Sequence, residues 1–202
     1  MKEIKYAFRM VHIDNIPHIA SCGFVHRDSP LASPNYIEIG SREVIEKRNI
    51  YALDTLLSEC IPFYFGYRTP MLYAIQNGYN VKQVKAESIV YCVITLNDLI
   101  RDNISCIFSD GHALANLTDF HPGSMLSQIT LFINPDDIYA KYWHDDYDRD
   151  LQRRKSAELL LKQELGPQYI KGYVVYNDWA YQKLKSFGIE ETKIIIRAQY
   201  YF

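Results

Sequence analysis

The sequence predicts an α+β protein, in which short helices surround a mixed β-sheet. Short apolar segments rich in β-branched and aromatic residues, typical of strands, alternate with segments that begin at helix-capping residues. The alternation lacks the regular strand–helix–strand rhythm of a doubly wound fold, which favours a mixed sheet. The chain has 202 residues, of which 48% are hydrophobic and 23% are charged. This composition fits one globular domain, residues 1–202, with a substantial core.

Several segments are expected to be strands. They cover residues 5–11, 61–65, 88–95, 105–110, 157–165, 169–176 and 193–197. The segment 88–95, SIVYCVIT, has the β-branched and aromatic content of a buried strand. The segment 105–110 is expected to end in a turn at Asp110 and Gly111.

Helices are expected where a residue that can cap a helix precedes a helical segment. The first helix should start at Asp14 or Asn15, with Pro17 in its first turn, and the second at Ser41, before the charged segment 42–49. A third helix should start at Thr69, just before Pro70. Two more are expected from Asn134, before Pro135, through Lys141, and from Asn177 to Phe187. Gly23 and Gly188 stand where the first and last helices should end, because glycine readily adopts the conformation that closes a helix.

The charge balance and the missing motifs exclude several classes of function. With 22 basic and 24 acidic residues the net charge is −2, so the whole molecule does not attract polyanions and any such binding must be local. Glycine-rich nucleotide-binding motifs and the HExxH zinc motif are absent. Cys22, Cys60, Cys92 and Cys106 are too widely spaced for a zinc site and are expected to be reduced thiols. We expect no metal.

The N-terminal segment MKEIKYAFRM mixes acidic and basic residues and lacks the apolar core of a signal peptide. No apolar segment approaches the roughly 20 residues that cross a bilayer. We therefore expect a cytoplasmic protein without a membrane partner.

The chain is unusually rich in tyrosine, with 17 Tyr against 9 Phe and 2 Trp. Tyrosine combines a stacking face with a hydroxyl, so the excess suits either a recognition surface or packing with hydroxyls at the surface. Composition alone does not choose between the two.

Two polar residues stand in or beside the expected strands. Glu158 lies among apolar residues in SAELLL, and a carboxylate there must face solvent or be buried with a partner. The alternation along a strand favours the solvent-facing position without deciding the question. His112 follows a turn, where its side chain can face a cleft, although a hydrogen-bonded loop histidine is the commoner case.

The segment PFYFGYRTPMLYAI, residues 62–75, resembles the central motif of the DarT family of bacterial DNA ADP-ribosyltransferase toxins. The resemblance continues upstream in VHIDNIPHIASCGF and IEKR. Downstream it includes FSDGHA, YWHDDYDRDLQRRKSAELLL and the final QYYF. It covers essentially the whole chain.

The resemblance implies the split mixed sheet of an ADP-ribosyltransferase, with NAD in a central cleft and no Rossmann motif. It also implies transfer of ADP-ribose from NAD, the co-substrate, onto a base of single-stranded DNA. The base is usually thymidine, and guanosine in one branch of the family. A single-stranded substrate also follows from the chemistry, because a base is accessible only when unpaired.

The resemblance assigns catalytic roles by position. The family's catalytic Glu matches Glu158, which would stabilise the positive charge that develops on the ribose as nicotinamide leaves. The resemblance therefore favours a buried, functional Glu158. The NAD-binding Arg matches Arg48, a fixed cation for the diphosphate, and the SDGH-type His matches His112. Either Glu158 or His112 could take the proton that must leave the acceptor base.

Further NAD contacts are implied near the N-terminus and in the central motif. His12 and Asn15 would line the nicotinamide pocket, and Tyr73 would stack on the nicotinamide ring. Tyr64, Tyr67 and Tyr147 also fall in or beside segments that should line the cleft.

The loop before Glu158, residues 145–157, shapes substrate choice in related transferases. Its expected DNA contacts are Tyr147, Arg149, Arg153, Arg154 and Lys155, preceded by Trp143 and His144. Cations there would hold phosphates while aromatic rings stack on bases. The alternative is a solvated turn, whose cations pair with Asp145, Asp146, Asp148 and Asp150.

The chain departs from the family pattern at several positions. Thr69 stands where Ser is usual, which keeps the hydroxyl. Ser156 replaces Gln and Leu159 replaces an aromatic residue, which predicts a difference at the edge of the substrate pocket. Phe8 and Arg9 stand where Tyr-His is frequent, so a nicotinamide or ribose contact in the first strand is not carried over.

An enzyme that modifies its host's DNA implies an antitoxin that removes the ADP-ribose, either a macrodomain protein or, in the guanosine branch, another hydrolase. We expect a monomer. Two alternatives stay open: an ADP-ribosyltransferase that acts on RNA or protein, and an inactive protein that only binds single-stranded nucleic acid.

Overall fold

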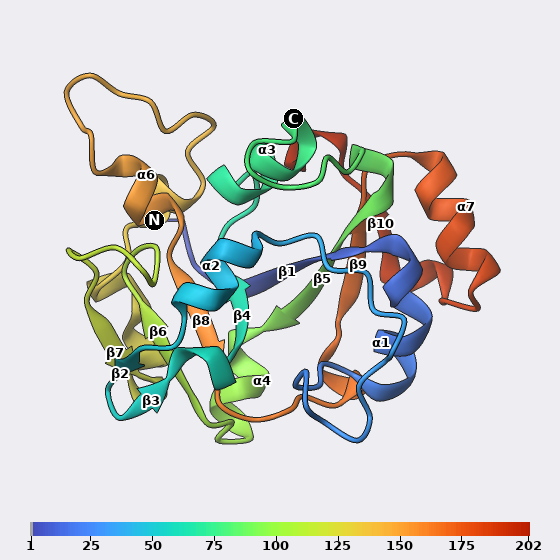
Figure 1. Ribbon diagram of the computed structural model, residues 1–202, viewed down its shortest axis with the longest axis horizontal. Helices are drawn as coiled ribbons and strands as arrows, with labels where there is room; N and C mark the ends of the chain where they lie inside the picture. The colour runs from blue at the N-terminus through green and yellow to red at the C-terminus, as the bar shows by residue number, and fades with distance from the viewer. Residues whose placement is uncertain (1) are drawn as a thin grey trace.

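The computed structural model describes residues 2–202 and is built on an eight-stranded sheet (Figure 1). The strand order is β10-β9-β5-β1-β4-β8-β6-β7. β9 and β10 are parallel, whereas the other neighbouring strands are antiparallel. This mixed sheet with short helices confirms the predicted α+β class.

The bounds of the elements follow the sequence signals closely. The strands of the sheet are β1 (Tyr6–His12), β4 (Ile61–Tyr64), β5 (Ile89–Thr95), β6 (Cys106–Ser109), β7 (Phe120–Pro122), β8 (Glu158–Leu161), β9 (Gly172–Val175) and β10 (Ile194–Ile196). A separate hairpin consists of β2 (Tyr51–Ala52) and β3 (Thr55–Leu56). The α-helices are α1 (Ile16–Cys22), α2 (Arg42–Lys47), α3 (Pro70–Asn77), α4 (Leu96–Arg101), α5 (Pro135–Ile138), α6 (Leu151–Lys155) and α7 (Asp178–Ser186).

Each segment expected to be a strand contains one, and the predicted caps at Ser41, Thr69 and Asn177 are confirmed. Each of these side chains accepts a hydrogen bond from the backbone N–H three residues further on. The helix expected from Asn134 to Lys141 is shorter and ends at Ile138. β7, the β2–β3 hairpin and α4 were not predicted, because short edge strands and a helix that directly continues a strand leave little local pattern.

The sheet is split between β1 and β4. β1 pairs with β5 along its whole length but with β4 through the single pair Phe8 and Tyr64. Arg9 bridges the diverging strands, because its Nη1 donates to the Pro62 carbonyl at 2.7 Å. Helix α2 lies in front of this split in Figure 1. The centre of the sheet is therefore where a cleft can form.

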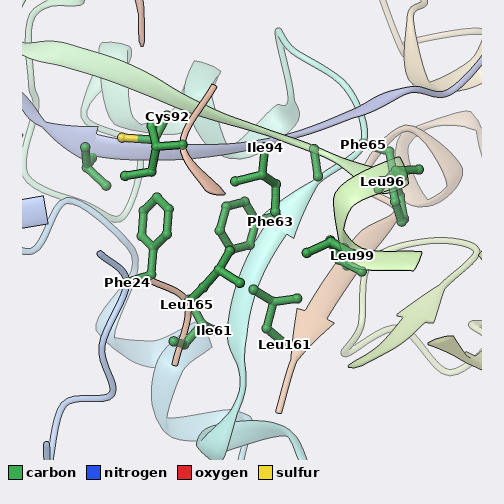
Figure 2. Close-up of a cluster of buried hydrophobic side chains, with 14 of the residues drawn as sticks. Phe24, Ile61, Phe63, Phe65, Cys92, Ile94, Leu96, Leu99, Leu161 and Leu165 are labelled. Carbon is green, nitrogen blue, oxygen red and sulfur yellow. The ribbon is translucent and has the colours of Figure 1, made fainter. Parts of the chain in front are cut away.

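Both faces of the sheet are buried. The consecutive residues Ala7 and Phe8 of β1 point to opposite faces of the sheet and belong to two different hydrophobic clusters. Figure 2 shows part of the larger cluster, in which the rings of Phe24 and Phe63 pack edge to face with centroids 5.0 Å apart. No helix within residues 2–202 is long and apolar enough to span a bilayer.

Replacement of Phe63 should destabilise the fold strongly, because this side chain is fully buried at the centre of the larger cluster. We expect Phe63→Ala to lower the free energy of unfolding by about 3–5 kcal/mol in a urea titration. Tyr51, 74% exposed, provides the control, and Tyr51→Ala should change stability by less than about 0.5 kcal/mol. Equal losses in both variants would contradict the assigned core.

Candidate active site

The centre of the candidate site is a buried ion pair between Arg48 and Glu158. Arg48 Nη2 donates to Glu158 Oε2 at 2.6 Å, and the Glu158 side chain has no solvent exposure. The second carboxylate oxygen, Oε1, accepts a hydrogen bond from the backbone N–H of Ala113 at 3.1 Å. A buried charge is tolerated only with such partners. Glu158 is therefore buried, and the solvent-facing alternative is wrong.

Neighbouring strands hold Glu158 in place. It begins β8, which lies between β4 and β6, and it pairs across the ladder with Tyr64. Its backbone N–H donates to Ser109 Oγ at 3.2 Å, and the same hydroxyl donates to the Gly111 carbonyl at 2.7 Å. The first residue of β8 is thus fixed to the turn that carries His112.

Arg48 reaches the carboxylate from the end of α2, 110 residues earlier in the chain. Burial alone would lower the pKa of Arg48, but Glu158 more than offsets this effect, and the pKa lies above its usual value. Burial and the charge of Glu158 both raise the pKa of the Tyr64 phenol, which is therefore neutral at pH 7. Arg48 Nη1 is buried and has no hydrogen-bond partner among residues 2–202.

Two cavities lie beside the ion pair. The first, of about 790 Å³, lies over the split in the sheet and is lined by Arg9 and Arg48 among others. The second, of about 460 Å³, is lined by His112, Arg149, Gln152, Arg153 and Ser156. Tyr64 and Met71 line both cavities and so form the wall between them. The first cavity falls within the roughly 300–1,000 Å³ typical of small-molecule sites.

His112 is a neutral hydrogen-bond donor in the second cavity. Its ring Nδ1 accepts from the Leu114 N–H at 3.3 Å, which places the proton of the neutral ring on Nε2. Burial lowers the pKa of His112, and Glu158 only partly opposes this effect. The imidazole is therefore uncharged at pH 7.

The structure does not bring Asn15 and His12 to the ion pair. The Asn15 side chain makes two hydrogen bonds with the backbone of Ile37, 2.8 and 2.9 Å long, and so fastens the segment before α2 to the start of α1. His12 Nδ1 accepts from the Asp14 N–H and caps a short 3₁₀ turn. Neither residue lines the two cavities described above. Their contact with NAD stays a prediction.

Tyr73 also lies away from the cavities, although Met71 and Ile75 of the same helix line the first one. Its ring, 37% exposed, packs edge-on against Trp143 and Phe202, with centroids 5.6 and 5.1 Å apart. Stacking of Tyr73 on nicotinamide likewise stays a prediction.

The structure corrects the role predicted for Lys155. Its side chain has no solvent exposure, and its ammonium donates to the carbonyls of Ala140 at 2.6 Å, Ile138 at 3.1 Å and Tyr67 at 3.4 Å. The segments of Gly66 and Ile138 can lie this close together only because Gly66 has no side chain, since a Cβ there would lie 2.3 Å from the Ile138 oxygen. Lys155 therefore ties together three backbone segments and cannot contact a phosphate.

The neighbouring arginines of α6 are paired within the protein, which confirms only part of the solvated-turn alternative: Asp148 and Asp150 are partners, and Asp110 and Asp137 come from elsewhere in the chain. Arg153 bonds to Asp150 and Asp110, both at 2.8 Å. Arg154 bonds to Asp137 at 2.6 Å and to Asp148 at 2.5 Å. The two arginines thereby organise the loop that projects beside α6 in Figure 1.

Two predicted DNA contacts stay available in this loop. Arg149 is exposed, lines the second cavity and forms no ion pair within the described chain. Tyr147 is fully exposed. Sequence reasoning counted all the cations of the loop equally, because the carboxylates that occupy Arg153 and Arg154 come partly from distant segments.

The departures from the family pattern fall into three groups. Thr69 caps α3 with its hydroxyl, so it replaces Ser without loss of that contact. Ser156 lines the second cavity, as expected for a difference at the pocket edge. Leu159 does not, because it is fully buried in the larger hydrophobic cluster.

Two further site residues were not predicted. Arg9 was noted only as a departure from the family pattern, because alternation places it on the same face of β1 as the core residues Ala7 and Val11 and gives no sign that it lines a cavity. Ala113 contributes through its backbone N–H, for which no side-chain signal exists. No group of His, Cys, Asp and Glu side chains within residues 2–202 is arranged to hold a metal ion.

A split mixed sheet with a buried arginine–glutamate pair beside a large cleft is the arrangement expected of an ADP-ribosyltransferase. The family model described as "ssDNA thymidine ADP-ribosyltransferase, DarT" matches residues 8–202. The chain therefore belongs to the DarT family and is a DNA ADP-ribosyltransferase.

Relatives match along nearly their whole length. A DNA ADP-ribosyl transferase of Escherichia coli O127:H6 is 28% identical over 205 residues, which cover 96% of this chain and 92% of that protein. The structure of Thermus sp. 2.9 DarT in complex with ADP-ribosylated ssDNA has a TM-score of 0.83 and 26% identity, with 100% and 98% of the two chains covered. The same Thermus protein in complex with NAD+ gives a TM-score of 0.78 and 25% identity, with 100% and 99% covered.

Replacement of Lys155 should change how stability depends on pH. Burial lowers the pKa of Lys155 from 10.5 to about 8 in the folded protein, and Arg68 adds to this effect. Between these values the unfolded chain binds more protons, so the destabilising effect of the buried charge is full below pH 8 and disappears as the pH rises toward 10.5. We expect the unfolding free energy of the wild type to rise by about 2 kcal/mol relative to Lys155→Met between pH 7.5 and 10.

Urea unfolding at each pH measures this difference. Lys141 is exposed, so Lys141→Met serves as the control and should follow the wild-type pH dependence. Parallel curves for the wild type and Lys155→Met would contradict a buried ammonium.

Proposed function

We propose that this enzyme transfers ADP-ribose from NAD+ to thymidine in single-stranded DNA and acts as the toxin of a toxin–antitoxin pair. The observation that carries the proposal is the buried Glu158 carboxylate, which is held by Arg48 of the first cavity and pairs across the ladder with Tyr64, which lines both cavities. The solved Thermus structures with NAD+ and with ADP-ribosylated ssDNA support it.

The reaction exchanges one glycosidic bond for another. The bond between C1′ of the ribose and the nicotinamide nitrogen breaks, and its electron pair leaves with nicotinamide. A ring nitrogen of the base bonds to C1′ and loses its proton, so the products are ADP-ribosylated base, nicotinamide and one proton. Positive charge builds on the ribose in between, and the fixed carboxylate of Glu158 stabilises it.

The two cavities divide the substrates between them. The larger cavity takes NAD+, with Arg48 on the diphosphate, because a guanidinium donates paired hydrogen bonds to phosphate oxygens. The smaller cavity takes the base, where His112, Arg149 and the nearby Tyr147 can contact the nucleotide. Tyr64 and Met71, in the wall between the cavities, lie where C1′ and the base nitrogen must meet.

Glu158, rather than His112, receives the proton of the base. The hydrogen bond from Leu114 keeps His112 Nδ1 occupied and its proton on Nε2, so the ring can donate but not accept at its free nitrogen. Each oxygen of Glu158 accepts one hydrogen bond from the protein and retains a further lone pair. His112 Nε2–H then serves as a donor to an oxygen of the base.

An oligonucleotide assay tests the reaction. Incubation of the protein and NAD+ with single-stranded oligonucleotides should give the mass of one added ADP-ribose where thymidine is present, and little product on the same sequence as a duplex. Glu158→Gln should reduce the rate by at least about 100-fold. Glu190→Gln, at an exposed carboxylate outside both cavities, is the matched control and should retain activity.

The outcomes separate the alternatives. An adduct on guanosine alone would overturn thymidine as the target. No adduct on any base, with labelled NAD+ incorporated into RNA or protein, would overturn DNA as the substrate.

Expression in a bacterial host tests the toxin role. The wild type should inhibit growth, and Glu158→Gln should not, because inhibition requires the DNA adduct. Co-expression of a macrodomain hydrolase should remove the adduct and restore growth, as measured by plating and by mass spectrometry of DNA. Equal toxicity of Glu158→Gln would instead point to nucleic-acid binding without catalysis.

A further inference from the structure

We propose that Arg9 is a second diphosphate-binding residue, which forms with Arg48 a two-cation floor in the first cavity. The proposal rests on the proposed use of NAD+ and adds a residue and a ligand contact to that site. It concerns a position at which this chain carries a cation in place of a frequent histidine of the family.

The burial of the charged residues around the first cavity singles out these two arginines. The cavity is also lined by Arg27, Asp28, Glu38, Glu46, Glu59 and Lys162, all of which are exposed. Arg48 is buried and Arg9 is half-buried. Exposed charges of both signs at the rim are screened by solvent, whereas charges on the floor are screened much less. Because Glu158 is paired with Arg48, the two arginines and this carboxylate together carry a net charge of about +1, which keeps the floor positive.

Arg9 retains unused hydrogen-bonding capacity. Its Nη1 donates to the Pro62 carbonyl across the split between β1 and β4. Arg9 also lies beside Tyr36, where its charge and a side-chain hydrogen bond lower the pKa of the phenol against the dominant, opposite effect of burial. A guanidinium carries five N–H donors in a planar fork, so these two contacts leave other donors free. Arg48 is in a similar state, because Nη2 holds Glu158 while Nη1 has no partner in residues 2–202.

The two guanidinium groups share one neighbour, Tyr64, in the lining of the first cavity. Both Arg9 and Arg48 are close enough to Tyr64 for their charges to favour its ionised form, against the dominant effect of burial on its pKa. Both line the same cavity. Two cations that line one cavity with a neutral phenol, each with free donors, match a ligand that carries two linked phosphates. A diphosphate with its two negative charges fits this floor better than a neutral ring or a ribose.

The alternative role for Arg9 is structural, as a bridge between the diverging strands. Arg9→Gln separates the two roles, because an amide can still donate to the Pro62 carbonyl but carries no charge. Arg9→Lys keeps the charge and loses the paired donors. Arg42, exposed at the start of α2 and outside both described cavities, provides Arg42→Gln as a control with the same change in net charge.

Isothermal titration with NAD+ and with ADP-ribose tests the proposal. We expect Arg9→Gln to weaken both ligands by a similar factor of about 10 or more, since a charge-assisted hydrogen bond to phosphate is lost. Arg9→Lys should lie between Arg9→Gln and the wild type, and Arg42→Gln should bind as the wild type does. An equal loss of affinity for the two ligands would locate the contact at the diphosphate, because ADP-ribose contains the diphosphate but no nicotinamide.

Each other result counts against the proposal. Wild-type affinity of Arg9→Gln for both ligands would leave Arg9 a structural bridge only. Loss confined to NAD+ would place Arg9 at nicotinamide. Thermal unfolding of each variant shows whether weaker binding reflects a damaged fold, in which case Arg9→Lys would be destabilised as well. A wild-type protein that binds neither ligand would overturn the proposed function itself.

Discussion

The ion pair between Arg48 and Glu158 is the constraint on which the site depends. Glu158 begins an interior strand and has no access to water, so its charge requires a partner from elsewhere in the chain. Arg48 can supply it only because α2 crosses in front of the sheet, at the split between β1 and β4 (Figure 1). Ser41, which caps α2, and the Asn15 contacts that fasten the preceding segment are therefore part of the same arrangement.

Local signals predicted the elements well, but the environment of the site depends on distant segments. The caps at Ser41, Thr69 and Asn177 are encoded within a few residues. The burial of Glu158 is not, because alternation along β8 says nothing about the strands and the helix that cover it. Lys155 shows the same limit: in the sequence it extends a run of cations, whereas in the fold three carbonyls from two other segments surround it.

The tyrosines divide between the core and the surface. Tyr91 and Tyr201 are buried, and the Tyr201 hydroxyl lies within hydrogen-bond distance of the Ile89 and Val174 carbonyls. Tyr147, in contrast, is fully exposed on the loop before α6. The cations of that loop divide in the same way, since Arg153 and Arg154 are bound to carboxylates and Arg149 is not. Local pairing therefore limits how much of the loop's charge can act on DNA.

The residues that contact Glu158 lie in or beside both cavities. Arg48, which holds one carboxylate oxygen, lines the first cavity, and Tyr64, which pairs with Glu158 across the ladder, lines both. The backbone N–H of Ala113 holds the other oxygen, and Ala113 directly follows His112, which lines the second cavity. A phosphate group in the first cavity can accept from the free Nη1 of Arg48 while Nη2 holds Glu158, because a guanidinium carries several donors in one plane. The same guanidinium thereby connects the first cavity to the buried carboxylate without breaking the ion pair.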